Sequence, residues 1–322
     1  MSYALRALHI DEEERFLVRV AWACYVEGMT QGAAAERFGV TRLRVNKALG
    51  EVRRRGLVRI SIKSPYASCA ELETQLKLSY QLTEVHVTPR ADRPENVQLL
   101  VGTALGHFLR DYLANPSVRL FGMSWGQTLN LATRFMEPLN RKDLEIVAVM
   151  GGLSKGSEIN SFEITTRLAE LCNAQHSYLT APLYAGSRES RDTICQLDVF
   201  RETITKITSV DAMAMAAGDI SPRTLLVRHG LPKGVSIEEL IDLGAVGDVL
   251  GYVLNARGEP IDHSINEKVI GMKLSDLKNI KPVILAAGGT HKIPIIKAAL
   301  SASLADILIT DEDTALGLMQ TE

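Results

Sequence analysis

Apolar residues recur at helical spacing through the first part of the chain, and glycines or threonines punctuate the pattern. The first segment opens with acidic residues, which favour the positive end of a helix dipole, and Gly28 ends it. Thr30 and Thr41 stand where N-caps are expected, and Gly39 suits a tight turn between the segments that they open. The pattern predicts three helices, at 11–27, 30–38 and 41–55.

The second and third predicted helices have the residue spacing of a helix-turn-helix. Ala35 is the small side chain that closely crossing helices need, Gly39 permits a positive φ in the turn, and Val45 packs one helix onto the other. The helix from Thr41 to Arg55 is then the recognition helix, whose first side chains face base edges or phosphates. Each residue alone is a weak signal, but the set indicates this motif.

The segment after the recognition helix is predicted to form a wing. Gly56 suits a helix C-cap, and residues 57–62 alternate apolar and polar side chains, which is typical of a β-strand. Pro65 breaks the alternation. Leucines among polar residues then predict a linking helix at 70–80, which also offers a surface for pairing subunits.

Beyond Thr83, short β-branched runs alternate with helical patterns. This alternation predicts a doubly wound, mostly parallel α/β sheet, in which ligands bind beyond the carboxyl ends of the strands. The strands are predicted at 83–87, 118–123, 144–149, 175–180, 212–217, 249–254, 282–287 and 307–310. The clearest helices are predicted at 95–113, 127–135, 161–172, 292–301 and 311–319.

The length of 322 residues favours two domains, one small and one large. We expect a winged helix-turn-helix domain at 1–63, a linking helix with a surface for oligomerisation at 64–82, and an effector domain at 83–322. Hydrophobic residues make up 46% and charged residues 23% of the chain, as in globular proteins with a substantial core.

No apolar run reaches the roughly 18 residues that a membrane helix needs, and the first residues lack the apolar core of a signal peptide. We therefore expect a cytoplasmic protein without a membrane partner. The four cysteines lie far apart, with no CxxC spacing and no histidines at metal-ligand distance, so reduced, structural thiols are expected. Nothing in the pattern indicates a metal, a cofactor or catalytic residues.

The formal net charge of −2 hides an asymmetry along the chain. Up to residue 62, Lys and Arg outnumber Asp and Glu by 11 to 7, whereas the remainder has 25 against 31. Between Thr41 and Arg59 there are seven basic residues and one acid, Glu51. Such a concentration suits the phosphates of DNA, because each neutralised phosphate releases condensed counterions. A solvated helix face is the alternative for an arbitrary charge run.

Side chains at the start of the recognition helix are the predicted contacts with a DNA duplex. Arginine fits the edge of guanine and asparagine fits that of adenine, whereas the basic residues at 53–55 are better suited to phosphates. The helix dipole alone also favours cations at 53–55, and this alternative stays open. The predicted DNA-binding residues are Gln31, Thr41, Arg42, Arg44, Asn46, Lys47 and Arg54.

Four glycine-rich or polar loops follow predicted strands of the large domain. Residues 124–128 (Ser-Trp-Gly-Gln-Thr) precede a helix, and free backbone N–H groups and hydroxyls there suit an anion such as phosphate. Residues 150–152 (Met-Gly-Gly) and 288–292 (Gly-Gly-Thr-His-Lys) follow two other strands, and Lys292 adds a point charge. Asp311 is expected either to cap the last helix or to accept hydrogen bonds from sugar hydroxyls. Tight-turn chemistry explains any one such loop, but four in one sheet favour a ligand site.

With these motifs in order, the chain resembles the SorC-type sugar-binding transcriptional regulators, the group that includes the DeoR and CggR proteins. The resemblance covers nearly the whole length. In the first part it rests on Met29-Thr30-Gln31, Gly39-Val40-Thr41 and Gly56-Leu57-Val58. In the remainder it rests on Gly122 to Thr128, Met150-Gly151-Gly152, Gly244 to Asp248, Ala287-Gly288-Gly289 with Lys292, and Thr310-Asp311-Glu312 with Ala315.

The resemblance implies an effector domain related to sugar-phosphate isomerases and glucosamine-phosphate deaminases, without their catalysis, that forms tetramers on operator DNA. Independently, one recognition helix reads only a few base pairs, so a symmetric dimer or larger assembly is expected. By this analogy the residues around a phosphate are Ser124, Gly126, Gln127, Thr128, Gly289 and Lys292, and those nearer the carbon chain are Gly152, Asp248 and Asp311.

The chain departs from the family where Asp211 is followed by Ala217-Gly218-Asp219-Ile220 in place of a Gly-Ile-Gly-type turn. An acid there repels a second phosphate, which favours a singly phosphorylated or unphosphorylated ligand. Pro294 suits the first turn of a helix, so we expect Lys292 at the start of that helix.

Two classes of function compete. A repressor of a carbohydrate or polyol catabolic operon, controlled by a bound sugar, polyol or sugar phosphate, explains both the basic helix and the loops. The sequence does not distinguish whether the ligand releases or strengthens DNA binding. The alternative is a sugar-phosphate isomerase or deaminase, for which Asp211, Asp219, Asp248, Glu312 and His291 are candidate acids and bases. The histidines show no paired carboxylate motif, and an enzyme has no use for a recognition helix, so the regulator is favoured.

Overall fold

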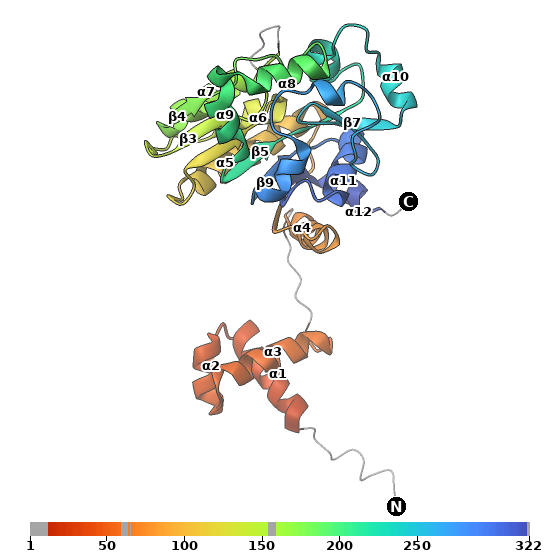
Figure 1. The fold of residues 1–322 in the computed structure, drawn as a ribbon. Helices are drawn as coiled ribbons and strands as arrows, with labels where there is room; N and C mark the ends of the chain where they lie inside the picture. Colours follow the sequence, from red (N-terminus) through yellow and green to blue (C-terminus); the bar gives the residue numbers. More distant parts are fainter. Residues whose placement is uncertain (1–11, 59–63, 65, 154–158, 321–322) are drawn as a thin grey trace, which may run out of the picture. The chain divides into compact units, whose positions relative to one another are not determined.

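The protein, described here by a computed structural model, has defined structure at residues 12–58, 64, 66–153 and 159–320. The chain divides into two compact units, Met1–Ser64 and Pro65–Glu322 (Figure 1). One cluster of buried apolar side chains holds the small unit together, and two clusters hold the large unit together.

The described part of the small unit consists of helices α1 (Glu12–Tyr25), α2 (Gln31–Phe38) and α3 (Arg42–Arg54). The Thr30 hydroxyl accepts a hydrogen bond from the Ala33 N–H at the start of α2, and the Thr41 hydroxyl accepts one from the Arg44 N–H at the start of α3. Gly39 ends α2 with a φ of 63°, in the left-handed region. These caps and this turn confirm the predicted helix-turn-helix.

The core of the small unit is built from the face that each helix turns inward. Val45 and Val52 of α3 pack with Ala35 of α2 and with Leu17 and Val20 of α1, and all five are buried. The predicted wing strand at 57–62 falls largely on residues 59–63, which lie outside the described residues. The expected start of the first helix at residue 11 also lies outside them.

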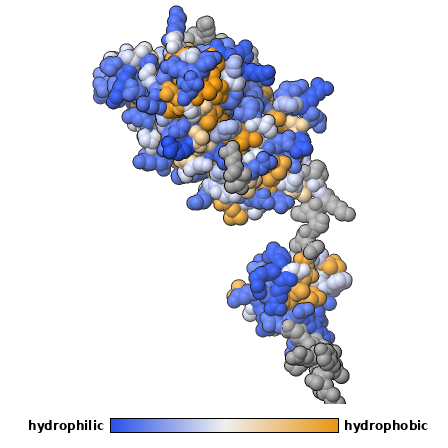
Figure 2. Space-filling view, turned by 90° about the vertical axis from the view of Figure 1, so that its right-hand side faces the viewer, coloured by the Kyte–Doolittle hydropathy of each residue, from blue (hydrophilic) through white to orange (hydrophobic). Residues whose placement is uncertain are grey.

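Part of the exposed surface of α1 is apolar. Val18 and Trp22 are 46% and 57% exposed, and Tyr25 and Val26 continue the exposed surface around the end of the helix. Apolar side chains gather on one side of the small unit in Figure 2. Helix α1 therefore has large apolar side chains on its exposed surface as well as on the face that packs in the core.

A seven-stranded parallel sheet forms the centre of the large unit, with the strand order β1-β10-β9-β5-β2-β3-β4. Every neighbouring pair is parallel, as the alternation of strand and helix patterns predicts. Its strands are β1 (Glu84–Thr88), β2 (Leu120–Met123), β3 (Glu145–Ala148), β4 (Gln175–Ser177), β5 (Ala212–Met215), β9 (Val283–Ala286) and β10 (Ile307–Asp311).

Helices cover both faces of this sheet. Alternate residues of β5 point to opposite sides, so that Met213 joins one apolar cluster and Ala214 the other. This confirms the doubly wound arrangement. The α-helices are α4 (Ala67–Ser79), α5 (Val97–Leu113), α6 (Gln127–Phe135), α7 (Ser161–Cys172), α8 (Arg188–Gln196), α9 (Asp198–Thr208), α10 (Ile237–Asp242), α11 (Ile293–Ser301) and α12 (Glu312–Met319). Shorter helical turns are η2 (Pro94–Asn96), η3 (Leu226–Gly230), η4 (Asn266–Lys268), η5 (Leu274–Asn279) and η6 (Thr290–Lys292).

Within the described ranges, no helix is both long and apolar enough to span a bilayer.

The predicted strand at 249–254 is wrong. This apolar run contains a turn at Leu250 and Gly251, both with positive φ, and it joins two antiparallel strands. A small second sheet results, consisting of β6 (Ala217–Asp219), β7 (Ala245–Val249) and β8 (Tyr252–Asn255). The predicted strand at 212–217 likewise ends at Met215, because β6 begins at Ala217. Helices α8, α9 and α10 were not predicted.

Helix α4, at the position of the predicted linking helix, packs on the large unit. Leu72 and Leu76 are buried in one of its apolar clusters, whereas Leu78 is 76% exposed. The Tyr80 hydroxyl, just beyond the helix, donates a hydrogen bond to the Leu318 carbonyl of α12 at 3.0 Å.

Helices α5 and α6 approach each other closely because α5 has glycines where they touch. A Cβ added at Gly102 would lie 2.6 Å from the Leu131 Cβ, and one at Gly106 would lie 2.7 Å from the Ala132 carbonyl oxygen. This packing fixes the amino end of α6, which follows β2.

Candidate functional site

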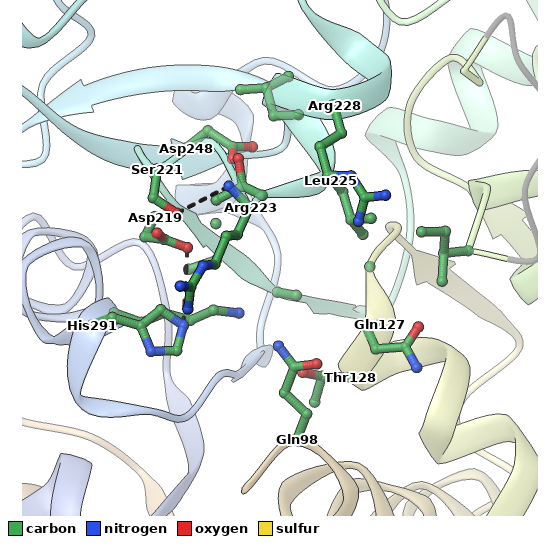
Figure 3. Close-up of a pocket in the computed structure, with 18 of the residues that line it drawn as sticks. Gln98, Gln127, Thr128, Asp219, Ser221, Arg223, Leu225, Arg228, Asp248 and His291 are labelled. Atoms are coloured by element: carbon green, nitrogen blue, oxygen red, sulfur yellow. Dashed lines mark hydrogen bonds and ion pairs between the residues drawn. The ribbon is translucent and has the colours of Figure 1, made fainter. Parts of the chain in front are cut away.

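A cavity of about 1170 Å³ opens at the carboxyl ends of the central strands β2, β5 and β9 (Figure 3). Residues 125–128 after β2, 216–219 after β5, and 288, 291 and 292 after β9 contribute to its lining. The wall is completed by Asp248, Ile159 and residues 94, 95, 97, 98, 221–226, 228 and 229. The cavity therefore lies where a parallel α/β sheet is expected to bind a ligand.

The amino end of α6 forms one side of the cavity. Gly126 precedes the helix with a φ of 129°, and Gln127 and Thr128 line the cavity from its first turn. The Ser124 side chain beside this turn is 1% exposed, and its hydroxyl has no hydrogen-bond partner among the described residues. Unpaired N–H groups at a helix start and an unsatisfied hydroxyl favour an anion or another hydrogen-bonding group here.

A buried cation lies on the opposite side, in η6 at the start of α11. Lys292 is 8% exposed and lines the cavity, and its ammonium group has no hydrogen bond or ion pair within the described part of the chain. Burial lowers the pKa of Lys292, and the charges of Asp219 and Asp248 partly oppose that shift. As the sequence predicts, Lys292 stands at the start of α11, and Pro294 lies in the first turn of that helix.

Two carboxyl groups accompany this lysine. Burial raises the pKa of Asp248 to about 7, although the Gly251 N–H and the charge of Lys292 act in the other direction. Asp219 lies 4.0 Å from the His291 ring and also lines the cavity. Hydroxyl groups of a ligand would find acceptors, and from a protonated Asp248 also a donor, in this group.

Sequence reasoning missed the segment after β6. Arg223 and Arg228 line the cavity, the latter from the π-helical turn η3, and Figure 3 shows both side chains at its wall. Neither guanidinium has a hydrogen bond or ion pair among the residues that the structure describes. Two basic residues in a segment just beyond a predicted strand were the available signal.

Of the nine predicted effector-binding residues, five line the cavity: Gly126, Gln127, Thr128, Asp248 and Lys292. The other four, Ser124, Gly152, Gly289 and Asp311, are not among the lining residues. A Cβ on Gly152 would lie 2.6 Å from the Phe162 ring, so this glycine serves close packing. Ser124 and Gly289 neighbour lining residues in sequence.

Asp311 does not line the cavity but forms a hydrogen bond with the loop after β9, which does. Its carboxylate is 1% exposed and accepts hydrogen bonds from the Thr314 N–H, the Thr314 hydroxyl and the Gly289 N–H. Of the two roles expected for Asp311, the helix cap is the one observed. The same carboxylate thereby ties the β9–α11 loop to the start of α12.

Of the five acids and bases considered for an enzyme, two lie away from the cavity. Asp211 accepts hydrogen bonds from the Arg119 and Leu120 N–H groups, at the opposite ends of the strands. Glu312 accepts one from the Arg90 N–H and is not among the lining residues. Only Asp219, Asp248 and His291 of the five candidates line the cavity.

The predicted DNA-binding side chains on α3 fall into two groups. The Arg44 guanidinium lies 5.1 Å from the centre of the Phe16 ring, and Arg54 pairs with Glu51. Arg54 and Arg55 lower the pKa of Glu51 to about 2. Arg42, Asn46 and Lys47 are exposed and have no partner within the described residues. Gln31, which begins α2, is half-buried, and Thr41 is the exposed cap of α3.

All four cysteines are free thiols, of which Cys69 and Cys172 are buried and Cys24 and Cys195 are half-buried. Over the described ranges, no group of three or more His, Cys, Asp or Glu side chains could hold a metal ion.

Three comparisons with known proteins find a sugar-binding domain and transcriptional regulators. The Sugar-bind family model, a sugar-binding domain, matches residues 64–320. The transcriptional regulator LsrR of Enterobacter sp. is 31% identical over 315 residues, covering 95% of this chain and 93% of LsrR. The erythritol catabolism regulatory protein EryD of Brucella abortus is 26% identical, covering 96% of this chain and 98% of EryD. The full-length sorbitol operon regulator SorC of Klebsiella pneumoniae has a similar fold, with a TM-score of 0.71, 24% identity, and coverage of 96% and 100%.

Proposed function

The chain belongs to the SorC-type family of sugar-binding transcriptional regulators, and on that basis we propose that its small unit binds operator DNA while its large unit binds a sugar, a polyol or one of their phosphates. The chain is accordingly a regulator and not an enzyme. The proposed division assigns DNA binding to residues 1–63, a connecting and oligomerising role to 64–82, and effector binding to 83–322. Because operator DNA is chromosomal, we propose a cytoplasmic location.

The cavity at the strand ends is the observation that carries this proposal. It pairs the α6 amino end, which suits an anion, with Lys292 and the carboxyl groups of Asp219 and Asp248, which suit hydroxyls. Asp219 and Asp248 disfavour a second phosphate, whereas Arg223 and Arg228 at the cavity wall oppose that effect, so the proposed ligand is a sugar, a polyol or one of their phosphates. The names of EryD and SorC, which refer to erythritol and sorbitol, point to the same class of ligand.

On the DNA side, we assign the contacts to the first turns of α3. Arg42, Asn46 and Lys47 are exposed there and free to reach a duplex. Thr41 and Gln31 stand at the starts of α3 and α2, where backbone N–H groups favour phosphates. Arg44 and Arg54 reach DNA only by leaving Phe16 and Glu51. One such helix reads only a few base pairs, so we propose a dimer or tetramer that binds two half-sites and represses the operon.

A thermal-shift screen of the full chain tests the effector site. The probes are erythritol, xylitol, sorbitol, their phosphates and inorganic phosphate, because a ligand that binds only the native state raises the melting temperature. The matched variant Lys292→Met keeps the side-chain length and removes the charge. We expect at least one polyol or polyol phosphate to raise the melting temperature of the wild type, and Lys292→Met to lose that increase.

Operator binding by Lys292→Met is the companion measurement. We expect the variant to bind promoter fragments with wild-type affinity in gel-shift titrations. Adding the ligand should not change that affinity. In contrast, Arg42→Ala and Arg44→Ala should weaken DNA binding and keep the thermal response. A variant at position 292 that responds at the wild-type ligand concentration would contradict the placement of the site.

A further inference from the structure

Leu43 is an exposed apolar side chain near the start of α3. It is 65% exposed, although it stands in the second position of a helix whose other apolar side chains, such as Val45 and Val52, are buried. Successive residues of an α-helix are rotated by about 100°, which places Leu43 roughly half a turn from the middle of the buried face. Leu43 therefore points directly away from the core of the small unit.

The surroundings of Leu43 are polar and open. Arg42 precedes it, and Asn46 and Lys47, both exposed, lie one helical turn further along. A turn beyond them is Gly50, where an added Cβ would meet no atom within 4 Å. No other exposed large apolar side chain occurs on α3.

This setting argues against a protein partner for Leu43. The apolar surface of α1, at Val18 and Trp22, belongs to a different helix, and α1 packs on the buried face of α3. A protein interface is expected to have several apolar side chains at its centre, whereas Leu43 is surrounded by cations and an amide. Those neighbours are instead the side chains that bind phosphates and base edges.

We propose that Leu43 contacts the 5-methyl group of a thymine in the major groove of the operator, beside the base pair that Asn46 reads. The thymine methyl is the apolar group that distinguishes an A·T pair at the major-groove edge, and an aliphatic side chain is its natural contact. The absence of a side chain at Gly50 allows α3 to approach the groove floor closely. This inference rests on the proposed DNA binding and adds a determinant of sequence preference to it.

Replacing thymine by deoxyuridine tests the contact, because it removes only the methyl group. The full chain is first used to select binding sequences from a random duplex pool. Duplexes of a selected sequence are then made with a single deoxyuridine in place of each thymine in turn. Loss of one buried methyl is expected to weaken binding by the wild type about fourfold at one or two positions per half-site.

Three variants locate the contact. Leu43→Ala should bind the all-thymine duplex more weakly, by about fourfold or more, and lose nothing further from deoxyuridine at the sensitive positions. Leu43→Met, which keeps an apolar side chain of similar length, should keep the sensitivity. Leu243→Ala, at a 45% exposed leucine in the large unit, is the matched control and should keep both affinity and sensitivity. Circular dichroism checks that each variant is folded.

A second readout separates the methyl contact from charge. Leu43→Ala should leave the salt dependence of binding unchanged, whereas Lys47→Ala should reduce the slope by about one counterion.

Three results would overturn the inference: wild-type binding that ignores every deoxyuridine, a Leu43→Ala variant that remains sensitive at the same positions, or a selected half-site without thymine. Failure of the proposed function looks different, since the pool would then yield no sequence that is preferred over random duplex.

Discussion

Replacing Asp311 by alanine should destabilise the large unit without removing any group that lines the cavity. The carboxylate is 1% exposed, caps α12 and accepts a hydrogen bond from the Gly289 N–H at 3.1 Å. Alanine removes all of these acceptors at once. The Gly289 N–H keeps a bond of 2.8 Å to the Thr314 hydroxyl, whereas the Thr314 N–H loses its partner.

The expected loss follows from these contacts. Loss of the N-cap oxygen, which leaves the Thr314 N–H without its partner, costs about 1 kcal/mol. The buried Thr314 hydroxyl also loses the carboxylate to which it donates, and a buried donor left without a partner costs about 1–3 kcal/mol. Together they give about 2–4 kcal/mol in the free energy of unfolding of the large unit. Asp311→Asn keeps one acceptor oxygen in the cap position, so its loss should be less than half as large.

Urea unfolding followed by tryptophan fluorescence measures this difference. The chain has two tryptophans, Trp22 in the small unit and Trp125 at the cavity of the large unit. A Trp22→Phe background, at a side chain that is 57% exposed, leaves Trp125 as the reporter of the large unit. An Asp311→Ala variant within about 0.5 kcal/mol of the parent, the range of ordinary surface substitutions, would refute the structural role assigned here.

Three further changes have expected outcomes. Thr41→Ala removes the α3 cap and should lower the stability of the small unit by about 1 kcal/mol, measured by Trp22 fluorescence; an unchanged midpoint would contradict the cap. The pKa of Asp248 is raised to about 7, so the native state holds a proton that the unfolded chain releases, and the free energy of unfolding should fall as pH rises from about 4 to 7. Asp248→Asn should reduce this slope in melting temperatures taken across that range, and an identical slope would exclude Asp248 as its source. Gly106→Ala should lower the free energy of unfolding by about 1–3 kcal/mol, because the added methyl group overpacks against Ala132. A rise in melting temperature, from the better helix propensity of alanine, would instead show that α5 and α6 can move apart to accommodate the methyl group.

Local chemistry made the small unit and the parallel sheet predictable. The N-caps at Thr30 and Thr41 and the left-handed Gly39 depend on residues within a few positions of one another, so the sequence pattern contains them. The strands of the parallel sheet are buried on both faces and therefore appear as short apolar runs. Five of the helices that follow them begin within two residues of the predicted positions.

The errors arose where contacts made in the folded chain decide between equivalent local patterns. The run at 249–254 is apolar throughout, and the turn at Leu250 and Gly251 is recognised only from the antiparallel pairing of β7 with β8. Asp311 suits a cap and a ligand contact equally well in sequence, and its bond to Gly289, 22 residues away, shows which role it takes. Arg223 and Arg228 reach the cavity because of the path of the chain after β6, which periodicity does not encode.

The four free thiols of the native chain should react slowly with labelling reagents. Burial raises the pKa of each thiol, that of Cys172 to about 11, so little thiolate is present near neutral pH. Each unit of pKa reduces the thiolate fraction about tenfold, and thiolate is the form that reacts with maleimides. A cysteine introduced at the open position of Gly50 should therefore react much faster than the native four. It would place a fluorophore on the face of α3 assigned to DNA.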